Sequence, residues 1–306
     1  MTTKKCVACG SSQVKKYGKV RGRQRFQCLY CGRQFILKRD KTSLRKKLWK
    51  EYVWHRQTLT QMADRYGRTV QWVQRQLDAA PISSVPDLPQ RIIAVTDTTF
   101  FGRGYGILVV RCPRLKKNVH VHELQLETPA EYHAARASLE TQGFIIEAAV
   151  IDGKRGVLAV FPDIPVQFCQ FHQIAIVRRY LTSRPKLPAG RELRAMALAL
   201  PTIAEQTFTN LLAIWHKRWE QFLKERTYTP NSRRFQYTHR RIRSAYRSLK
   251  TNTPYLFTYQ KYPHLHIPNT TNSIDGFFSK LKHLLNTHRG LTIHRRYKLI
   301  QEILGL

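Results

Sequence analysis

Two pairs of cysteines near the start of the chain restrict its fold more than any other feature. Four of the six cysteines form these Cys-x-x-Cys pairs, Cys6 with Cys9 and Cys28 with Cys31, and a glycine follows each pair. Four thiolates at this spacing are typical of a zinc ribbon, in which two hairpin turns hold one tetrahedral Zn²⁺. We therefore predict a zinc ribbon with one structural Zn²⁺ in residues 1–40. Two unrelated pairs of redox or core cysteines are the alternative, although neither pair lies in the βαβ pattern of a redox motif.

A helical segment follows the cysteine pairs. Apolar residues recur at helical spacing over residues 43–80, and the spacing breaks near Gln57 and at Gly67, which predicts three short helices. The last two have the length of a helix-turn-helix, with Gly67 in the turn and Thr69 as the N-cap of the second helix. We predict a helix-turn-helix DNA-binding domain here. A helical spacer with a solvated polar face is the alternative, because the sequence does not show which face would meet DNA.

A proline-rich segment separates this N-terminal part from the rest of the chain. Residues 81–90 contain three prolines and no hydrophobic periodicity, which is typical of a linker. The following patterns predict strands and helices in the order β-β-β-α-β-α-β. The predicted strands are RIIAVTD, GILVVRC, VHVHELQL, FIIEAAVID and VQFCQFH, and PAEYHAARASLETQ is a predicted helix. This order predicts a mixed α/β domain, whose first part spans residues 91–187.

A long helical stretch interrupts this domain. Residues 188–265 are rich in Lys, Arg and aromatic residues and predict an all-helical insertion, after which residues 266–306 form the final helices of the core. Trp215 and Trp219 lie one helical turn apart, which favours a place in the helix core. Stacking of either ring on a flipped DNA base is the alternative.

The net charge of the chain points to a polyanionic partner. The sequence has 53 Lys and Arg against 19 Asp and Glu, a formal net charge of +34. Hydrophobic residues make up 42% of it, so the chain can bury a core and is no disordered basic tail. It has neither an apolar run long enough for a membrane span nor the start of a signal peptide, and too few cysteines for a disulfide scaffold. We expect reduced thiols and a cytoplasmic location.

Three aspartates stand out in this acid-poor chain. Asp97 closes the first strand of the α/β domain, and Asp152 closes the fourth. Carboxylates at the C-terminal ends of neighbouring strands can converge, and their hard oxygen ligands hold Mg²⁺ or Mn²⁺. Such a site needs a third carboxylate. Asp275 is the best candidate, because it stands alone near the start of a basic amphipathic helix.

Each aspartate also has a structural interpretation. Asp97 and Asp152 are plausible strand-end turn residues, and an acid in the first turn of a helix stabilises the helix macrodipole whatever its function. Glu123 and Glu147 are alternatives for the third carboxylate. Both lie within predicted strands, where alternation explains them more easily.

The order of these features resembles the RNase H-like catalytic domain of DDE transposases. CQFH, from Cys169 to His172, is similar to the Cys-x-x-His signature of the Mutator-like insertion-sequence transposases, and TNSIDG…HRG resembles that group's final motif. The resemblance covers about residues 91–300, and a ribbon with a helix-turn-helix fits the group's DNA-binding front end. The group normally carries Glu where this chain has Asp275. The resemblance implies a multi-domain α/β protein with an RNase H-like mixed sheet.

The resemblance also implies a mechanism. Two divalent ions roughly 3.5–4 Å apart would promote phosphoryl transfer, with Asp97 bridging both ions and Asp152 and Asp275 each completing the shell of one. DNA would be cleaved at the transposon ends and joined to target DNA. His172 would lie close to this site, contacting the scissile phosphate or supporting the acids. On the predicted buried strand, however, Cys169 and His172 are equally well explained as core residues.

The expected partner is double-stranded DNA, both the terminal inverted repeats of a transposon and its target. The resemblance implies a homodimer or larger assembly on DNA in a bacterial, nucleoid-associated setting, with no membrane. Two other functions stay open. One is a domesticated, catalytically inactive transposase that acts as a DNA-binding regulator, and the other is a structure-selective nuclease on the same fold.

Overall fold

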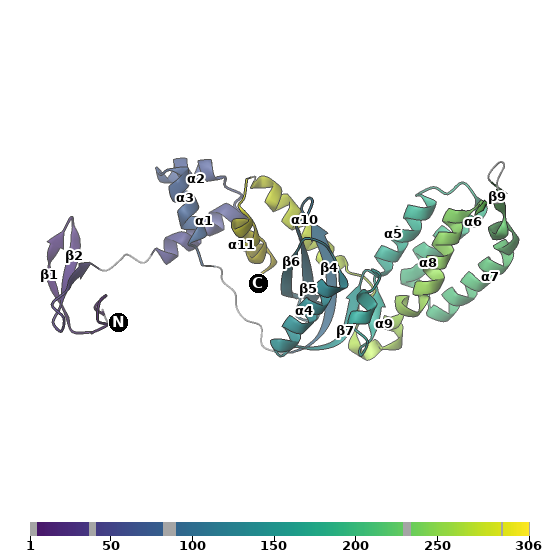
Figure 1. Ribbon diagram of the computed structural model, residues 1–306, viewed down its shortest axis with the longest axis horizontal. Coiled ribbons are helices and arrows are strands. Elements are labelled where there is room, and N and C mark those ends of the chain that lie inside the picture. Colours follow the sequence, from purple (N-terminus) through teal and green to yellow (C-terminus); the bar gives the residue numbers. More distant parts are fainter. Residues whose placement is uncertain (1–4, 37–40, 82–89, 229–233, 289, 306) are drawn as a thin grey trace. The chain divides into compact units, whose positions relative to one another are not determined.

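The computed structural model describes residues 5–36, 41–81, 90–228, 234–288 and 290–305 (Figure 1). The chain divides into two compact units, Met1–Pro81 and Ile82–Leu306. The predicted linker, residues 81–90, lies outside the described residues except for its first and last positions. Within the described part of the chain, no helix has both the length and the apolar composition needed to cross a lipid bilayer.

The first unit begins with a small antiparallel sheet. Its strands are β1 (Val14–Val20), β2 (Arg23–Cys28) and β3 (Gln34–Ile36), in the order β1-β2-β3. Arg21 and Gly22 form the two-residue turn between β1 and β2, and both have positive φ, as a type I′ hairpin turn requires. The buried cluster consists of four side chains, Cys6, Phe26, Cys28 and Phe35. So small a core leaves the cysteines as its main source of stability.

Three helices complete the first unit, as the hydrophobic spacing predicts. They are α1 (Thr42–Trp54), α2 (Leu59–Tyr66) and α3 (Val70–Asp78). Gly67 ends α2 in the left-handed conformation, with φ 56°, and the Thr69 hydroxyl caps α3 by accepting from the Trp72 N–H. Thr58 and Gln61 form a capping box at the start of α2, which the sequence analysis missed.

A mixed five-stranded sheet forms the centre of the second unit. The strands are β4 (Arg91–Phe100), β5 (Gly106–Cys112), β6 (Lys117–Leu124), β7 (Ile145–Ile151) and β8 (Val166–Phe168). The order is β6-β5-β4-β7-β8, with antiparallel pairing from β6 to β4 and parallel pairing from β4 to β8. Helix α4 (Pro129–Thr141) joins β6 to β7. This confirms the prediction of a mixed α/β fold.

Three details of the predicted sheet are wrong. Strand β4 continues past Asp97 to Phe100, because Thr98–Phe100 pair with the start of β5. A 3₁₀ turn at Val157–Val160 replaces the helix predicted between β7 and β8. Strand β8 ends at Phe168, so Cys169 and His172 lie at the start of a helix and not on a strand.

Helices pack together beside the sheet in the second unit (Figure 1). They are α5 (Gln170–Leu181), α6 (Pro188–Ala199), α7 (Glu205–Lys224), α8 (Arg240–Leu256) and the short α9 (Thr258–Lys261). The prediction of an all-helical insertion is wrong, because the hairpin strands β9 (Arg226–Tyr228) and β10 (Phe235–Tyr237) lie between α7 and α8. Two last helices, α10 (Asn272–Thr287) and α11 (Ile293–Leu304), follow, and α10 packs against β4.

Candidate active site and metal centre

The four paired cysteines form one cluster, as their spacing predicts. Their sulfur atoms all lie within 4.8 Å of one another, and the Sγ atoms of Cys6 and Cys31, and of Cys9 and Cys28, are 3.6 Å apart. Tetrahedral Zn²⁺ with Zn–S bonds of about 2.3 Å separates its sulfurs by about 3.8 Å. The cluster is therefore close enough to bind a metal ion and is consistent with a structural zinc site.

The local backbone also favours thiolates in this cluster. The Cys31 N–H hydrogen bond to the Cys28 sulfur outweighs the effect of burial and lowers the pKa of Cys28 to about 6. Backbone N–H groups of Ala8 and Cys9 lower the pKa of Cys6 in the same way. Cys9 differs, because the Ser11 N–H lowers its pKa but burial and the other three cysteines together raise it to about 12. Because only thiolates bind metal tightly, these turns prepare Cys6 and Cys28 for an ion.

The three aspartates predicted from the sequence come from three elements of the second unit. Asp97 lies on β4, Asp152 directly follows the neighbouring parallel strand β7, and Asp275 lies in the first turn of α10. The Asp97 side chain is buried, and Asp152 and Asp275 are partly exposed. The packing of α10 on β4 brings the third acid to the edge where the first two lie.

The three carboxyl groups lie close enough to influence one another electrostatically. Burial raises the pKa of Asp97 to about 7; His172 and the Thr98 N–H oppose this shift, while the charges of Asp275 and Asp152 add to it. Burial also raises the pKa of Asp152. Buried acids with raised pKa values are typical of sites whose charge a cation or substrate will balance.

His172 belongs to the same group of residues, although it lies on α5 and not on a strand. The Cys169 sulfur beside it raises the pKa of His172 to about 9 against the effect of burial, and the charges of Asp97 and Asp152 raise it further. These neighbours favour the protonated imidazole. The charges of Asp97 and Asp152 therefore act on the His172 ring, and its role at the site stays a prediction.

Hydrogen bonds attach the start of α10 to the end of β7 through Cys169. The Cys169 N–H donates to the Ile151 carbonyl at 2.7 Å, and its sulfur accepts from the N–H and the hydroxyl of Thr271 at 3.3 and 3.5 Å. Both Cys169 and Thr271 are completely buried. Cys169 therefore connects the strand that precedes Asp152, through its backbone N–H, to the start of the helix that carries Asp275, through its sulfur. The core interpretation of Cys169 is correct as to burial, but it misses this connecting role.

The three aspartates are arranged more openly than the cysteines. Among the described residues, the cysteine cluster is the one set of three or more His, Cys, Asp or Glu side chains whose ligand atoms all lie within 4.8 Å of one another. The donor set is nevertheless suited to Mg²⁺ or Mn²⁺, since carboxylate oxygens are their usual protein ligands and these ions keep several waters. A divalent cation would also balance the negative charge of the buried Asp97 carboxylate, whose pKa is raised in the absence of metal.

The alternative acids are engaged elsewhere. Glu123 accepts a hydrogen bond from the Tyr105 hydroxyl at 2.7 Å, and Glu147, near the opposite end of β7, accepts from Arg91 at 2.6 Å. Glu127 was not singled out from the sequence. Its charge raises the pKa of Asp152, and it follows β6 at the edge where Asp152 lies. Its place shortly after the end of a predicted strand was the sequence signal that could have identified it.

The two tryptophans belong to the helical packing. Trp215 is 3% exposed, and its indole N–H donates to the Ala189 carbonyl. The Trp219 N–H donates to Glu192 at 2.7 Å. The helix-core interpretation is correct for Trp215, and its stacking on a DNA base is excluded by burial.

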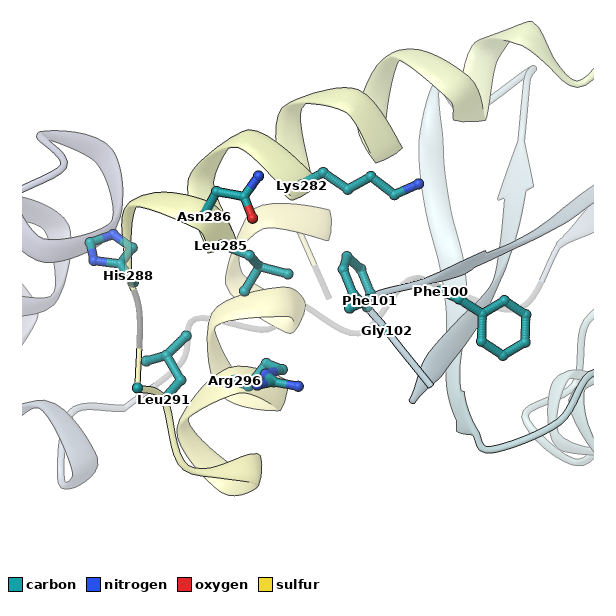
Figure 2. Close-up of a pocket in the computed structure, with 10 residues that line it drawn as sticks. Phe100, Phe101, Gly102, Lys282, Leu285, Asn286, His288, Leu291 and Arg296 are labelled. Atoms are coloured by element: carbon teal, nitrogen blue, oxygen red, sulfur yellow. The ribbon is translucent and has the colours of Figure 1, made fainter. Parts of the chain in front are cut away.

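A cavity of about 470 Å³ lies further along two of the elements that carry the acids. Its walls come from the end of β4, the second half of α10 and the start of α11. Figure 2 shows Phe101, Lys282 and Arg296 reaching it from these three directions. Its lining combines the cationic side chains of Lys282 and Arg296 with Phe100 and Phe101.

No family model matches the chain, and no curated protein is similar enough to count as a match.

Proposed function

We propose that the chain is a transposase of the DDE type that binds transposon ends and catalyses metal-dependent DNA cleavage and strand transfer. One observation carries this proposal: Asp97 lies on β4, Asp152 directly follows the neighbouring parallel strand β7, and Asp275 lies in the first turn of α10, which packs against β4. The sheet supports it, because three antiparallel strands followed by two parallel ones are what the RNase H-like resemblance implies. The Cys-x-x-His segment next to the acids supports it as well.

The acids and His172 divide the chemistry between them. Asp97, Asp152 and Asp275 would hold two Mg²⁺ or Mn²⁺ ions, which supply activation of water or a 3′-hydroxyl and stabilisation of the leaving oxygen. The neighbours of His172 favour its protonated form, which would attract the scissile phosphate to a group of acids that otherwise repel it. Cys169 and Thr271 keep the third acid in place.

The first unit is suited to DNA recognition in this proposal. Residues 1–39 contain no Asp or Glu, while Lys and Arg are frequent on β1 and β2. The cationic hairpin of β1 and β2 could enter the major groove, and so could the second helix of a helix-turn-helix. Structural Zn²⁺ at the cysteine cluster would hold the ribbon in shape. Both ends of a transposon must be joined, so a homodimer or larger assembly on DNA is part of the proposal.

The test is a strand-transfer assay with the full chain. The protein is incubated with duplexes that carry the genomic sequences flanking its gene, with a target plasmid and Mn²⁺, and products are separated by size. We expect cleaved ends and joined products that depend on Mn²⁺. Cleavage without joining would identify a structure-selective nuclease, and sequence-selective binding without cleavage would identify a DNA-binding regulator.

A further inference from the structure

A network of polar side chains lies beside the catalytic aspartates and is not explained by them. Lys154 donates from its ammonium group to Glu127 at 2.6 Å, and the Tyr132 hydroxyl donates to the other oxygen of Glu127 at 2.6 Å. The Tyr132 hydroxyl is also 3.3 Å from the hydroxyl of Thr98, the residue after Asp97. The network therefore extends from Thr98, next to Asp97, to Lys154, two residues after Asp152.

The backbone of Lys154 is fixed relative to Asp152. Its N–H donates to the Asp152 carboxylate at 2.8 Å, which closes a tight turn. Gly153 in this turn has φ 80°, and a Cβ there would lie 3.0 Å from the Phe168 ring. The turn thus has little freedom, and the Lys154 side chain starts from a defined point.

The ammonium group is held in place and is still accessible. The Lys154 side chain is 34% exposed and that of Glu127 is 16% exposed, so the acid is the more deeply placed partner. An ammonium has three donors, of which the described contacts use one on Glu127. The remaining donors are available at the edge of the sheet where DNA must approach the aspartates.

A carboxylate at this position is unfavourable for DNA binding by itself. Glu127 adds negative charge next to Asp152, in a chain with 19 acids against 53 Lys and Arg. A surface ion pair contributes little stability, about 0–1 kcal/mol. The presence of Glu127 is better explained by a role in orienting Lys154 than by a contribution to the stability of the fold. The hydrogen bond from Tyr132 fixes Glu127 itself, as such a role requires.

We propose that Lys154 binds a backbone phosphate of the DNA at the catalytic edge, and that Glu127 and Tyr132 are positioning residues that hold its ammonium group there. The ligand class is a phosphodiester of the strand that enters the aspartate site. This inference rests on the proposed function. It adds a DNA contact that neither the aspartates nor the basic first unit provides.

The first experiment measures DNA binding by the full chain without added divalent ions. Lys154→Ala is compared with the wild type and with Lys116→Asn, which removes the same charge at the opposite edge of the sheet. Asparagine suits the positive φ of 54° at Lys116. We expect Lys154→Ala to reduce the slope of log affinity against log salt by about one.

A second arm locates the phosphate. Duplexes with a single neutral methylphosphonate at successive positions near the cleavage site are bound by the wild type and by Lys154→Ala. One position should weaken the wild type several-fold and leave Lys154→Ala unchanged, because the contact is already lost. If every position weakens both proteins equally, Lys154 makes no phosphate contact and the proposal is wrong.

Glu127→Gln separates positioning from binding. This variant keeps the shape of the side chain and removes its charge, so we expect equal or tighter DNA binding together with cleavage reduced about tenfold. Lys154→Arg should restore most of the salt slope. The double variant Glu127→Gln/Lys154→Met removes both charges and keeps the test valid if Lys154→Ala alone unfolds.

The outcomes distinguish this inference from the proposed function. A wild type that neither cleaves nor joins DNA contradicts the proposed function, whatever Lys154 does in the binding arms. Suppose instead that the wild type joins DNA ends, and that Lys154→Ala and Lys116→Asn show the same salt slope and the same methylphosphonate pattern. This result contradicts only the role of Lys154.

Discussion

The cysteine cluster of the first unit and the aspartate site of the second unit are built in opposite ways. The cluster gathers four ligands from two short turns within residues 6–31, and all its sulfurs lie within 4.8 Å. The aspartate site takes one residue each from β4, the end of β7 and a helix near the end of the chain, and it is more open. A compact local site has a fixed shape that serves the fold. An open site of distant residues can leave room for a substrate.

The largest expected effect is on activity and tests the aspartate side of this comparison. Asp152→Ala should abolish cleavage and strand transfer and leave DNA binding equal or slightly stronger, because affinity comes from the basic surface. The unfolding temperature should change little, since Asp152 is partly exposed. A variant that joins DNA ends at the wild-type rate would remove Asp152 from the site.

Changes at the cysteine cluster should affect folding of the ribbon and not the chemical step. Cys28→Ser, or removal of Zn²⁺ by a chelator, should unfold the ribbon, because its core has four buried side chains and metal binding supplies folding free energy. Sequence preference in DNA binding should fall with it. Metal analysis of protein purified without chelators should find one Zn²⁺ per chain, and an unchanged ribbon after Cys28→Ser would contradict the prediction.

The raised pKa of Asp97 predicts a pH dependence of the metal-free second unit. The folded pKa of about 7 lies above the ordinary 3.8, so the stability that Asp97 contributes is fully present below pH 3.8 and is lost as the pH rises through 7. Between pH 5 and pH 8 the wild type should therefore lose about 2–3 kcal/mol more than Asp97→Asn, whose amide does not titrate. Urea unfolding at both pH values measures this difference.

Asp163→Asn is the matched control for that experiment. Its partner Arg136 lowers the pKa of the exposed Asp163, so the same chemical change should not reduce the loss of stability between pH 5 and pH 8. Equal behaviour of the two variants would show that the Asp97 carboxyl is not buried as described.

A smaller effect is expected at the residue that connects two parts of the aspartate site. Cys169→Ala removes the sulfur that accepts from Thr271, so cleavage should fall about tenfold as the start of α10 loosens. Cys112→Ala, at an equally buried cysteine on β5, should cost similar stability and leave the rate unchanged. Equal rates for the two variants would contradict the connecting role.

The smallest effect is expected for Asp275→Glu. Because the aspartates are more open than the cysteine cluster, one added methylene can be accommodated, and cleavage should stay at or above the wild-type rate. The measurement is a strand-transfer assay that compares Asp275→Glu with the wild type and with Asp275→Ala, which should be inactive. Loss of activity with glutamate would show that the helix stands closer to the other acids than the resemblance implies.

The sequence predicted the parts that depend on local patterns. Cysteine spacing led to the cluster, helical periodicity led to α1, α2 and α3, and the signals at Gly67 and Thr69 are the cap residues found in the structure. Asp97 and Asp152 were expected at one edge of the sheet because both lie near the C-terminal ends of predicted strands. The two strands, β4 and β7, are parallel neighbours, so these ends do lie at the same edge.

The errors lie where distant residues determine the outcome. Alternation in VQFCQFH continues past Phe168, but the amides of Gln167 and Gln170 both donate to the Leu256 carbonyl, and the chain turns into a helix there. The hairpin of β9 and β10 has only three residues in each strand, too few for a periodic signal. Glu127 was missed because its partners Tyr132 and Lys154 come from other elements.

The dependence of the aspartate site on α10 has a consequence for protein synthesis. Asp275 leaves the ribosome about 120 residues after Asp152, which takes about 6–25 s at ordinary bacterial rates. During that interval the ribbon and the three-helix segment have already been made, while the third carboxylate is still missing. Under the proposed function, a nascent or prematurely terminated chain would therefore occupy DNA without cutting it, and such fragments would compete with the finished protein for the same ends.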